Sequence, residues 1–403
     1  MKTIYFDLDL PRVAATKAAS KTFHSLLFTG LNAVKYAKNL PDPPLPAPDW
    51  VRVRNIQCGV CGTDLSFFRC TATTNCALAP IPGSRRTYLG HENVGVVTEV
   101  GPAVTKFQVG DRVTLQEYMS SCGNKSIPQP CRFCRQGDYC LCENYGEPSP
   151  LKLPDVGAGF GDQFIAPQQQ LNKICDELTD DQATLVEPTA VSLHAVLRHT
   201  PKKGERVMVL GCGTIGLGVV QALKIFQPDC EVWVMERIKP KQEFAKKLGA
   251  DHILFGDPYA ATAKATGGSK VYGGKKNKMF FGGFDVIYDC VGGGWANTTC
   301  LRLLRARGTL VKIGHHMSAI TFDETPIWWQ ELTLVGVDAH GMEHIDGRDI
   351  STFDLAQELI RDGKYRTEGF ITHRFPLDDY KKAFRLMMAN PPELVKVVLD
   401  CRK

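Results

Sequence analysis

The sequence predicts an α/β protein built from two domains, a small twisted β domain and a doubly wound parallel sheet. The first observation is length, since 403 residues exceed the roughly 250 to 300 that one hydrophobic core can serve. The second is a series of short apolar runs broken by glycine between residues 51 and 116. The third is an alternation of apolar strands with amphipathic helices after residue 187, which is typical of parallel sheets.

Composition and charge narrow the classes of protein to which the chain can belong. Hydrophobic residues make up 43% and charged residues 23%, which is typical of folded chains. The formal net charge of +5 is small and the basic residues are dispersed, so no surface for nucleic acid is indicated. We find neither a charged leader with an apolar stretch nor an uncharged run of about 18 residues, the length of a membrane helix. We therefore expect a cytoplasmic protein with no nucleic-acid partner and no membrane partner.

The β domain is predicted from three apolar runs, at 51–56, 94–100 and 112–116. Loops rich in cysteine, proline and arginine separate or follow them at 68–87 and 118–147. Long loops in a compact domain are often functional, so we expect these two to hold metal or to shape a substrate pocket. The stretch before residue 40 carries no clear signal, and 40–48 is predicted to be an extended connection.

The parallel sheet is predicted from regular alternation along the second half of the chain. Apolar runs of strand length lie at 206–210, 231–236, 285–290 and 309–313. Amphipathic runs of helix length lie at 190–197, 214–226, 240–248 and 295–304. A glycine- and lysine-rich insert at 266–283 is predicted to be an exposed loop. Two more helices and a strand are expected near the C-terminus, at 355–361, 378–388 and 395–399.

A glycine motif follows the first strand of this sheet and opens its first helix. It reads Gly211-Cys212-Gly213-Thr214-Ile215-Gly216. The spacing is typical of a Rossmann dinucleotide site, because the glycines permit a tight turn, close approach of the backbone to a pyrophosphate and close packing of helix on strand. Unpaired amides at the start of the helix then face the phosphates. We predict that the coenzyme is bound by Gly211, Gly213, Thr214, Ile215 and Gly216.

An acid at the end of the next strand bears on the choice of coenzyme. Glu236 lies 20 residues after Gly216, where a carboxylate hydrogen-bonds the adenosine ribose and repels a 2′-phosphate, which favours NAD. Arg237 follows it and suits a 2′-phosphate, so NADP stays an alternative. Ile313 and Gly314, at the end of a later strand, are also assigned to the coenzyme site. A glycine turn in a domain without nucleotide is the remaining alternative.

The cysteines indicate metal sites. The chain has 15 of them, clustered at metal-type spacings without a secretion signal, which favours reduced thiols and metal over a disulfide scaffold. Cys61 lies in Gly59-Val60-Cys61-Gly62-Thr63-Asp64, and His91 lies in Gly90-His91-Glu92. A thiolate, an imidazole and carboxylates suit zinc, which accepts four mixed ligands.

These motifs carry a family resemblance. The sequence resembles the zinc-containing alcohol dehydrogenases of the medium-chain dehydrogenase/reductase superfamily. The resemblance is carried by the Gly-His-Glu motif, by Gly101 and Val104 at the expected distances after it, and by Gly110-Asp111-Arg112-Val113. The resemblance extends from about Val51 to the C-terminus. It implies a homodimer or homotetramer, for which the apolar run 333–337 is one candidate interface. The expected organisation is a GroES-like catalytic zinc domain, a Rossmann NAD(P)-binding domain and a C-terminal return to the catalytic domain, at 1–187, 188–338 and 339–403.

The segment before the nucleotide domain narrows the resemblance. Val186-Glu187-Pro188 resembles the Glu-Pro version found in sorbitol, glucose, butanediol and threonine dehydrogenases. The catalytic zinc ligands that this implies are Cys61, His91, Glu92 and, directly or through water, Glu187. The resemblance assigns the proton of the alcohol to Thr63 and a place behind the ligands to Asp64. As structure alone, Glu187 would be an acid at a helix start and Thr63 a turn residue.

A second cysteine cluster resembles the structural zinc lobe of the family. Three of the four cysteines of that lobe are matched, by Cys131, Cys134 and Cys142. Pro128 stands where the first cysteine is expected, and Cys122 is the substitute that we predict. Cys140 competes with Cys142 as the last ligand, although the distance from Gly137 favours Cys142. A lobe without metal is the alternative.

Together these features predict a zinc-dependent, NAD(P)-linked dehydrogenase that oxidises a secondary alcohol or polyol, or reduces the corresponding ketone. The substrate is expected to be a small alcohol, polyol or sugar-derived molecule. Arg85 and Arg86 shortly before His91 would suit an anionic group on that substrate. Two alternatives remain, a zinc-free quinone or enoyl reductase and a cofactor-binding regulator without catalysis.

Overall fold

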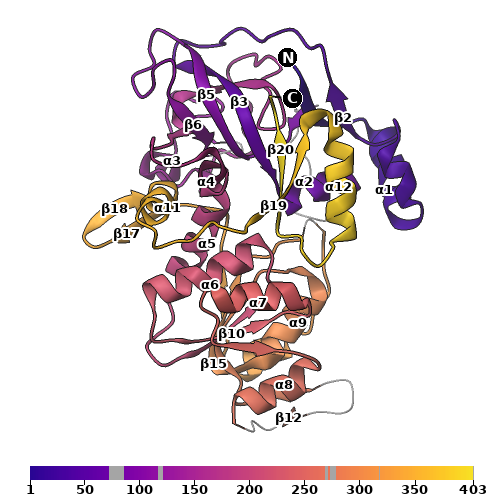
Figure 1. Ribbon diagram of the computed structural model, residues 1–403, viewed down its shortest axis with the longest axis vertical. Helices are drawn as coiled ribbons and strands as arrows, with labels where there is room; N and C mark the ends of the chain where they lie inside the picture. Colours follow the sequence, from indigo (N-terminus) through magenta and orange to yellow (C-terminus); the bar gives the residue numbers. More distant parts are fainter. Residues whose placement is uncertain (72–85, 117–120, 268–270, 273–277, 317, 403) are drawn as a thin grey trace. The chain divides into compact units, whose positions relative to one another are not determined.

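The computed structural model describes residues 1–71, 86–116, 121–267, 271–272, 278–316 and 318–402. The chain forms two compact units (Figure 1). Unit 1 comprises Met1–Glu187, His344–Arg361 and Thr367–Lys403, and unit 2 comprises Pro188–Glu343 and Asp362–Arg366. Within the described residues, we find no helix that combines the length and the apolar character needed to span a membrane.

The largest sheet of unit 1 contains the predicted β domain. Its strand order is β19-β20-β3-β5-β6-β8, and β7 also pairs with β3. The strands are β3 (Trp50–Val60), β5 (Glu92–Val100), β6 (Arg112–Leu115), β7 (Gln163–Pro167), β8 (Leu171–Lys173), β19 (Ile371–Pro376) and β20 (Lys396–Asp400). The predicted strands 51–56, 94–100 and 112–116 occur as β3, β5 and β6, with β6 ending one residue early. The strand predicted at 395–399 is β20, which pairs antiparallel with β3.

Alternating apolar side chains explain why this sheet forms. Val51 and Val53 of β3, Val97 of β5 and Val113 of β6 are fully buried and pack with Phe164 of β7. Each such side chain contributes roughly 1.5 to 3 kcal/mol when it leaves water. The β3–β5 pairing sets Gly59 opposite Glu92, so the end of one strand and the start of the other lie together.

The N-terminal stretch, in which the sequence showed no signal, is structured. A three-stranded sheet has the order β2-β1-β4 and consists of β1 (Thr3–Asp7), β2 (Val34–Ala37) and β4 (Arg86–Tyr88). Helix α1 (Leu10–Thr22) begins where Asp9 accepts a hydrogen bond from the backbone N–H of Arg12, with a proline in the first turn. The capping aspartate and the proline are visible in the sequence. However, α1 lacks a strong apolar stripe, and only its residues Thr16 and Ala19 are buried, so the hydrophobic pattern did not indicate a helix.

The other helices of unit 1 connect or cover its strands. They are α2 (Gly62–Arg69), α3 (Arg132–Gln136), α4 (Asp180–Thr184), α11 (Thr352–Arg361) and α12 (Tyr380–Ala389), with short 3-10 turns at His24–Phe28, Tyr139–Leu141, Gln168–Gln170 and Leu377–Asp379. Helix α12 packs on β19, β20 and α2 (Figure 1). A separate hairpin is formed by β17 (Met342–Ile345) and β18 (Arg348–Ser351).

Unit 2 contains the predicted parallel sheet. Its order is β11-β10-β9-β14-β15-β16, which, numbered along the chain, is the 3-2-1-4-5-6 order of a Rossmann sheet. Every strand pair in it is parallel. The strands are β9 (Arg206–Leu210), β10 (Glu231–Met235), β11 (His252–Leu254), β14 (Phe284–Asp289), β15 (Leu304–Lys312) and β16 (Thr333–Gly336). The helices are α5 (Val186–Arg198), which starts in unit 1, α6 (Thr214–Phe226), α7 (Lys239–Lys247), α8 (Pro258–Ala265), α9 (Gly293–Leu303) and α10 (Thr325–Trp329).

Two features of unit 2 differ from the sequence prediction. Strand β15 begins at Leu304, five residues before the predicted start at 309, because the chain passes directly from α9 into the strand. The insert at 266–283 was predicted to be an exposed loop, but its described part contains the paired strands β12 (Val271–Tyr272) and β13 (Met279–Phe280). Phe280 is fully buried in the core of unit 2, and this apolar anchor explains why the insert is not wholly exposed.

Candidate metal and coenzyme sites

The first candidate metal site lies where β3 ends and β5 begins. Cys61 is the residue that precedes α2, and His91 is buried directly before β5. Because β3 pairs with β5 in a register that sets Gly59 opposite Glu92, both motifs reach the same place. Ligand atoms of Cys61, His91 and Glu92 all lie within 4.8 Å of one another. The structure therefore brings together three of the predicted zinc ligands.

Asp64 fastens the two ligand segments to each other. One carboxylate oxygen accepts a hydrogen bond from the backbone N–H of Cys61 at 2.9 Å, and the other accepts one from Gly90 at 3.2 Å. Gly90 has a φ of +87°, and a Cβ there would lie 2.5 Å from the backbone nitrogen of Phe160, so glycine is required. Burial raises the pKa of the Asp64 carboxyl. Asp64 thus joins the backbone of the Cys61 segment to that of the His91 segment.

Glu92 has a partner that the sequence analysis missed. Both of its carboxylate oxygens lie 2.6 Å from Nζ of Lys396, which begins β20 and is also buried. Burial acts to lower the pKa of Lys396, but the charges of Glu92, Cys61 and Glu187 together with the hydrogen bond to Glu92 outweigh it, and the pKa is raised. A lysine inside the apolar run Leu394-Val395-Lys396-Val397-Val398 was the available signal, because a buried lysine must be paired.

Gly59 makes room for this carboxylate. A Cβ at Gly59 would lie 2.2 Å from Oε2 of Glu92, which is closer than two such atoms can approach. Because Gly59 has no side chain, Glu92, which lies directly opposite on β5, can face Lys396.

Glu187 lies in the same neighbourhood without joining the cluster of three. It stands in the first turn of α5 and is 5% exposed. Burial raises the pKa of Glu187 to about 8. The charge of Glu92 also raises this pKa, whereas the charge of His91 lowers it. Among the described residues, no hydrogen-bond donor contacts the Glu187 carboxylate at hydrogen-bonding distance. With its pKa raised to about 8, the Glu187 carboxyl is mostly protonated at neutral pH unless a cation lies beside it.

Thr63 lies beside the thiol of this site. Its hydroxyl oxygen is 3.7 Å from Sγ of Cys61, and the residue is buried in the first turn of α2. Ser66, one turn further along, hydrogen-bonds back to the carbonyl of Gly62.

The donor set of this site fits a zinc ion. A thiol, an imidazole and carboxylates on rigid elements are the mixture that zinc accepts. Burial raises the pKa of the Cys61 thiol to about 12, so a nearby cation would be needed to favour the thiolate. The same holds for the raised pKa of Glu187, because a divalent cation favours the ionised form of each.

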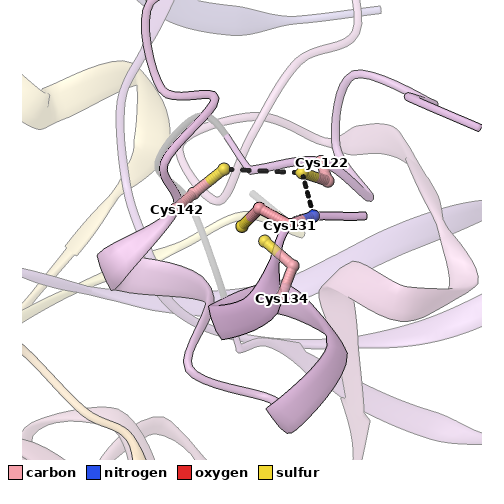
Figure 2. A group of neighbouring side chains, drawn as sticks. All are labelled: Cys122, Cys131, Cys134 and Cys142. Atoms are coloured by element: carbon pink, nitrogen blue, oxygen red, sulfur yellow. Dashed lines mark hydrogen bonds between the residues drawn. The ribbon is translucent and has the colours of Figure 1, made fainter. Parts of the chain in front are cut away.

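The second candidate metal site is a cluster of four cysteines (Figure 2). The sulfur atoms of Cys122, Cys131, Cys134 and Cys142 all lie within 4.8 Å of one another. Cys122 Sγ lies 3.6 Å from Cys142 Sγ and accepts a hydrogen bond from the backbone N–H of Cys131 at 3.3 Å, as Figure 2 shows. Cys122 therefore stands where a fourth thiol is needed, although Pro128 occupies the expected sequence position. Cys140, in the turn Tyr139–Leu141, is not part of the group.

Polar groups surround this cluster. The side-chain amide of Asn144 donates to Cys122 Sγ at 3.3 Å. Lys125 is buried beside it, where Nζ donates to the carbonyls of Asn144 and Tyr145. The cluster therefore has N–H donors and one lysine ammonium close to its sulfur atoms.

The coenzyme motif has the geometry that its glycines predict. Gly211 follows β9 with a φ of +90°, which permits the tight turn. Gly213 precedes α6, whose first residues are Thr214 and Ile215. A Cβ on Gly216 would lie 1.9 Å from the carbonyl oxygen of Gly211, so the third glycine is needed for close packing.

Glu236 is tied to this loop. Its carboxylate accepts hydrogen bonds from the backbone N–H of Cys212 at 2.9 Å and of Arg237 at 2.7 Å. Strand β10 ends at Met235, so Glu236 stands at the carboxyl edge of the sheet, where ligands of such sheets bind. The side chain of Arg237 is exposed.

A buried ion pair next to the coenzyme motif was not predicted. Asp289 is fully buried at the end of β14, pairs with Lys312 of β15, and accepts hydrogen bonds from the backbone N–H groups of Val291 and Gly292 at 2.9 Å. Its carbonyl accepts from the backbone N–H of Gly314 at 2.7 Å and of Ile313 at 3.2 Å. Asp289 thereby holds together two loops at the carboxyl edge of the sheet.

Comparison with known proteins agrees with this geometry. The family described as alcohol dehydrogenase GroES-like domain matches residues 47–176, and the family described as zinc-binding dehydrogenase matches residues 214–347. The chain belongs to the zinc-containing alcohol and polyol dehydrogenases of the medium-chain dehydrogenase/reductase superfamily. The family resemblance and the GroES-like and Rossmann folds predicted from the sequence are confirmed, and as a member of this family the protein is an oxidoreductase.

Several relatives of this dehydrogenase cover nearly the whole chain. (R,R)-butanediol dehydrogenase of Saccharomyces cerevisiae is 29% identical over 91% of this chain and 95% of the relative. L-idonate 5-dehydrogenase of Vitis vinifera is 29% identical over 89% of both chains. Among solved structures, 2R,3R-butanediol dehydrogenase from Bacillus subtilis is 26% identical, with a TM-score of 0.68 over 91% of this chain and 96% of that chain.

The anionic-substrate hypothesis is not supported by the described residues. Arg85 lies outside them. Arg86 forms an ion pair with Asp155 at 2.7 Å and lies over the ring of Tyr5, so its charge is already neutralised within the N-terminal sheet of the dehydrogenase.

Replacing Gly59 by alanine tests the packing of Glu92. We expect Gly59→Ala to lower the free energy of unfolding by about 1 to 3 kcal/mol, because the new Cβ would force the Glu92 carboxylate away from Lys396. The measurement is denaturant unfolding followed by circular dichroism. Gly62→Ala is the matched control, since a Cβ there meets no atom within 4 Å. Equal stability of the two variants would show that Glu92 adapts without cost.

Proposed function

We propose that this dehydrogenase is a zinc-dependent, NAD-linked enzyme that oxidises a secondary alcohol or polyol, or reduces the corresponding ketone. The observation that carries the proposal is the convergence of Cys61, His91 and Glu92 within 4.8 Å in a family of dehydrogenases. Relatives named for butanediol, idonate and sorbitol support a substrate that bears more than one oxygen.

The residues that would hold the catalytic zinc are Cys61, His91 and Glu92, with Glu187 as the further acid. Cys61 lies between β3 and α2, His91 directly precedes β5, Glu92 begins β5, and Glu187 lies in the first turn of α5. Asp64 would maintain the spacing of Cys61 and His91 through its two backbone contacts. When bound, zinc supplies a Lewis acid for the oxygen of the substrate, and the nicotinamide ring exchanges the hydride.

The residues of the chain would handle the proton. Thr63 presents its hydroxyl beside Cys61, where it would accept the proton of the substrate hydroxyl and pass it toward solvent. Ser66 stands where some relatives of the family carry a relay histidine, and its hydroxyl is bonded to a helix carbonyl. Proton exit would therefore use Thr63 with water or coenzyme hydroxyls instead of an imidazole at that position.

The coenzyme would bind at the carboxyl edge of the unit 2 sheet. Gly211, Gly213 and Gly216 would admit the pyrophosphate at the start of α6, with Thr214 and Ile215 supplying backbone N–H groups. Ile313 and Gly314 would lie along the coenzyme at the end of β15. Glu236 favours NAD by offering a carboxylate to the ribose, and Arg237 is the feature that would admit NADP. One solved relative, a zinc-binding dehydrogenase from Sinorhizobium meliloti that is 26% identical, is described as bound to NADP.

The four-cysteine cluster would hold a structural zinc. Cys122, Cys131, Cys134 and Cys142 provide four thiols without an open position, which is typical of a site that stabilises a fold. The protein is further proposed to form a homodimer or homotetramer. Strand β16 at the edge of the unit 2 sheet, with Leu334 exposed, supports an interface there.

Replacing His91 by alanine tests the catalytic site. We expect His91→Ala to lower kcat by at least about a thousandfold, because the pocket loses a neutral nitrogen ligand, while the Kd for NAD changes less than about twofold. The measurements are NADH absorbance with a diol substrate and fluorescence titration of the coenzyme. His24→Ala, at an exposed histidine, is the control. Undiminished turnover of His91→Ala would remove His91 from the mechanism.

Replacing Cys122 by serine tests the structural zinc. We expect the zinc content of Cys122→Ser to fall by one ion per chain, with lower thermal stability, because a closed site needs all four thiolates. Cys140→Ser is the matched control and should keep both ions. The measurement is metal analysis by mass spectrometry of the purified enzyme. If wild type holds one ion per chain the lobe carries no metal, and if it holds none the protein belongs with the zinc-free reductases.

Replacing Glu236 by glutamine tests the choice of coenzyme. We expect the wild-type enzyme to prefer NAD. Glu236→Gln should lower kcat/KM for NAD by about tenfold, because a charged acceptor for the ribose is lost, and the ratio of kcat/KM for NAD to that for NADP should fall. Arg237→Gln is the paired variant and should leave NAD use nearly unchanged. A wild-type preference for NADP that Arg237→Gln abolishes would show that Arg237 selects the coenzyme.

A further inference from the structure

A cavity of about 330 Å³ lies in unit 1, beside strand β2 of the N-terminal sheet. One side of it is formed by residues between 29 and 36, where the chain leaves the segment that carries α1 and enters β2, and the other by residues between 378 and 381, where α12 begins. Both stretches lie outside the ranges 47–176 and 214–347 that match the two families. Ligand pockets have volumes of about 300 to 1,000 Å³, so the cavity has the size for a small molecule.

Three cationic side chains converge on one loop at this cavity. Nζ of Lys35 donates a hydrogen bond to the carbonyl of Gly30 at 2.7 Å, and the guanidinium of Arg12 donates to the same carbonyl at 3.0 Å. Nζ of Lys381 donates to the carbonyl of Phe28 at 3.0 Å. Within the described residues, neither lysine forms an ion pair with a carboxylate. The partners of both ammonium groups are neutral carbonyls, so their positive charge lacks a counter-charge in direct contact.

The crowding of positive charge is visible at Lys35. Burial lowers the pKa of Lys35, and the charges of Arg12 and Lys381 lower it further. The carboxylates of Asp7 and Asp9 act in the opposite direction without restoring the ordinary value. An anion bound in the cavity would relieve this repulsion.

The acid that lines the cavity is already engaged elsewhere. The carboxylate of Asp378 accepts a hydrogen bond from the hydroxyl of Tyr36 and forms ion pairs with Lys38 at 3.0 Å and with Lys2 at 3.7 Å. The hydrogen bond from Tyr36 and the one from Lys38 lower the pKa of Asp378, so this carboxylate is ionised and compensated by these groups. It therefore leaves the two lysines of the cavity uncompensated.

A buried hydroxyl adds a further donor. Tyr380 lines the cavity, is 4% exposed and meets the ring of Tyr36 edge-on, with 5.8 Å between the ring centroids. Among the residues that the structure describes, none hydrogen-bonds to the hydroxyl of Tyr380. Burial raises the pKa of Tyr380 to about 12, so the hydroxyl keeps its proton at neutral pH and can donate it to an acceptor. Because a buried polar group without a partner is costly, an acceptor in the cavity would be stabilised there.

We propose that this cavity binds a small organic anion, whose phosphate or carboxylate group is held by Lys35, Lys381 and the hydroxyl of Tyr380. Ammonium and hydroxyl groups donate charge-assisted hydrogen bonds to such an anion. The rings of Tyr36 and Tyr380 supply an apolar wall for its carbon atoms. The site goes beyond the proposed dehydrogenation, because it uses none of the residues assigned to zinc, to the proton or to the coenzyme.

Calorimetric titration of the holoenzyme, saturated with NAD and held at constant ionic strength, tests the site. Phenyl phosphate and benzoate present the two anionic groups on the same ring, and benzamide is the neutral control. We expect saturable binding of at least one of the two anions with a Kd of about 1 mM or below, and at least about tenfold weaker binding of benzamide. Binding of phenyl phosphate without benzoate would identify a phosphate as the bound group, and the reverse result would identify a carboxylate.

Replacements at the cavity locate the bound anion. We expect the double variant Lys35→Gln, Lys381→Gln to raise the Kd by at least about tenfold, because both charged donors are lost, and Tyr380→Phe to raise it by about threefold or more, because only the hydroxyl is lost. Lys382→Gln is the matched control, since this exposed lysine pairs with Asp379, and it should change the Kd less than about twofold. Circular dichroism checks that each variant is folded.

Two results would overturn the inference. If the wild-type enzyme binds neither anion at concentrations up to about 10 mM, the cavity is not a site for this class of ligand. If binding occurs but is unchanged in the double variant and in Tyr380→Phe, the anion is bound elsewhere on the enzyme. The proposed dehydrogenase function is tested separately, because these titrations do not measure turnover.

Discussion

The antiparallel pairing of β3 with β5 is the constraint on which the candidate metal site of Cys61, His91 and Glu92 depends. Its register sets Gly59 opposite Glu92, so Cys61 at the end of one strand comes beside His91 at the start of the other. Asp64 then fastens the two segments through hydrogen bonds to the backbone on each side. The Cys61 and His91 motifs are thirty residues apart, and a slip of one residue in this pairing would turn every side chain of the strand to the other face and separate the donors.

Two buried carboxylates are compensated by a lysine close to them. Glu92 meets Lys396 from the C-terminal strand, and Asp289 meets Lys312 in the Rossmann sheet. Removal of one member of such a pair leaves an uncompensated charge, which costs several kcal/mol. The first pair lies beside Cys61, and the second joins the loops that follow β14 and β15.

The cysteine cluster shows how a departure from the family pattern can be accommodated. The loop that carries Cys122 places its sulfur 3.6 Å from that of Cys142, with Asn144 and the backbone of Cys131 as hydrogen-bond donors. Cys122 could be named as the substitute from the sequence because it lies nine residues before Cys131 in the same loop. The contribution of Lys125 was not predictable, since its burial depends on how the loop folds over the cluster.

The sequence by itself determined what local pattern and spacing can encode. It specified the Rossmann alternation, with β9 and α6 at the predicted bounds, the glycine motif with Glu236, and the pairing of a Cys61 motif with a His91 motif. Only the tertiary structure decided which distant groups meet: Lys396 with Glu92, Phe280 with the core of unit 2, and β1 with β4 in the N-terminal sheet. The physical reason is that periodicity and turn chemistry act over a few residues, whereas the partner of a buried charge or an unpaired strand is selected by packing across the whole unit.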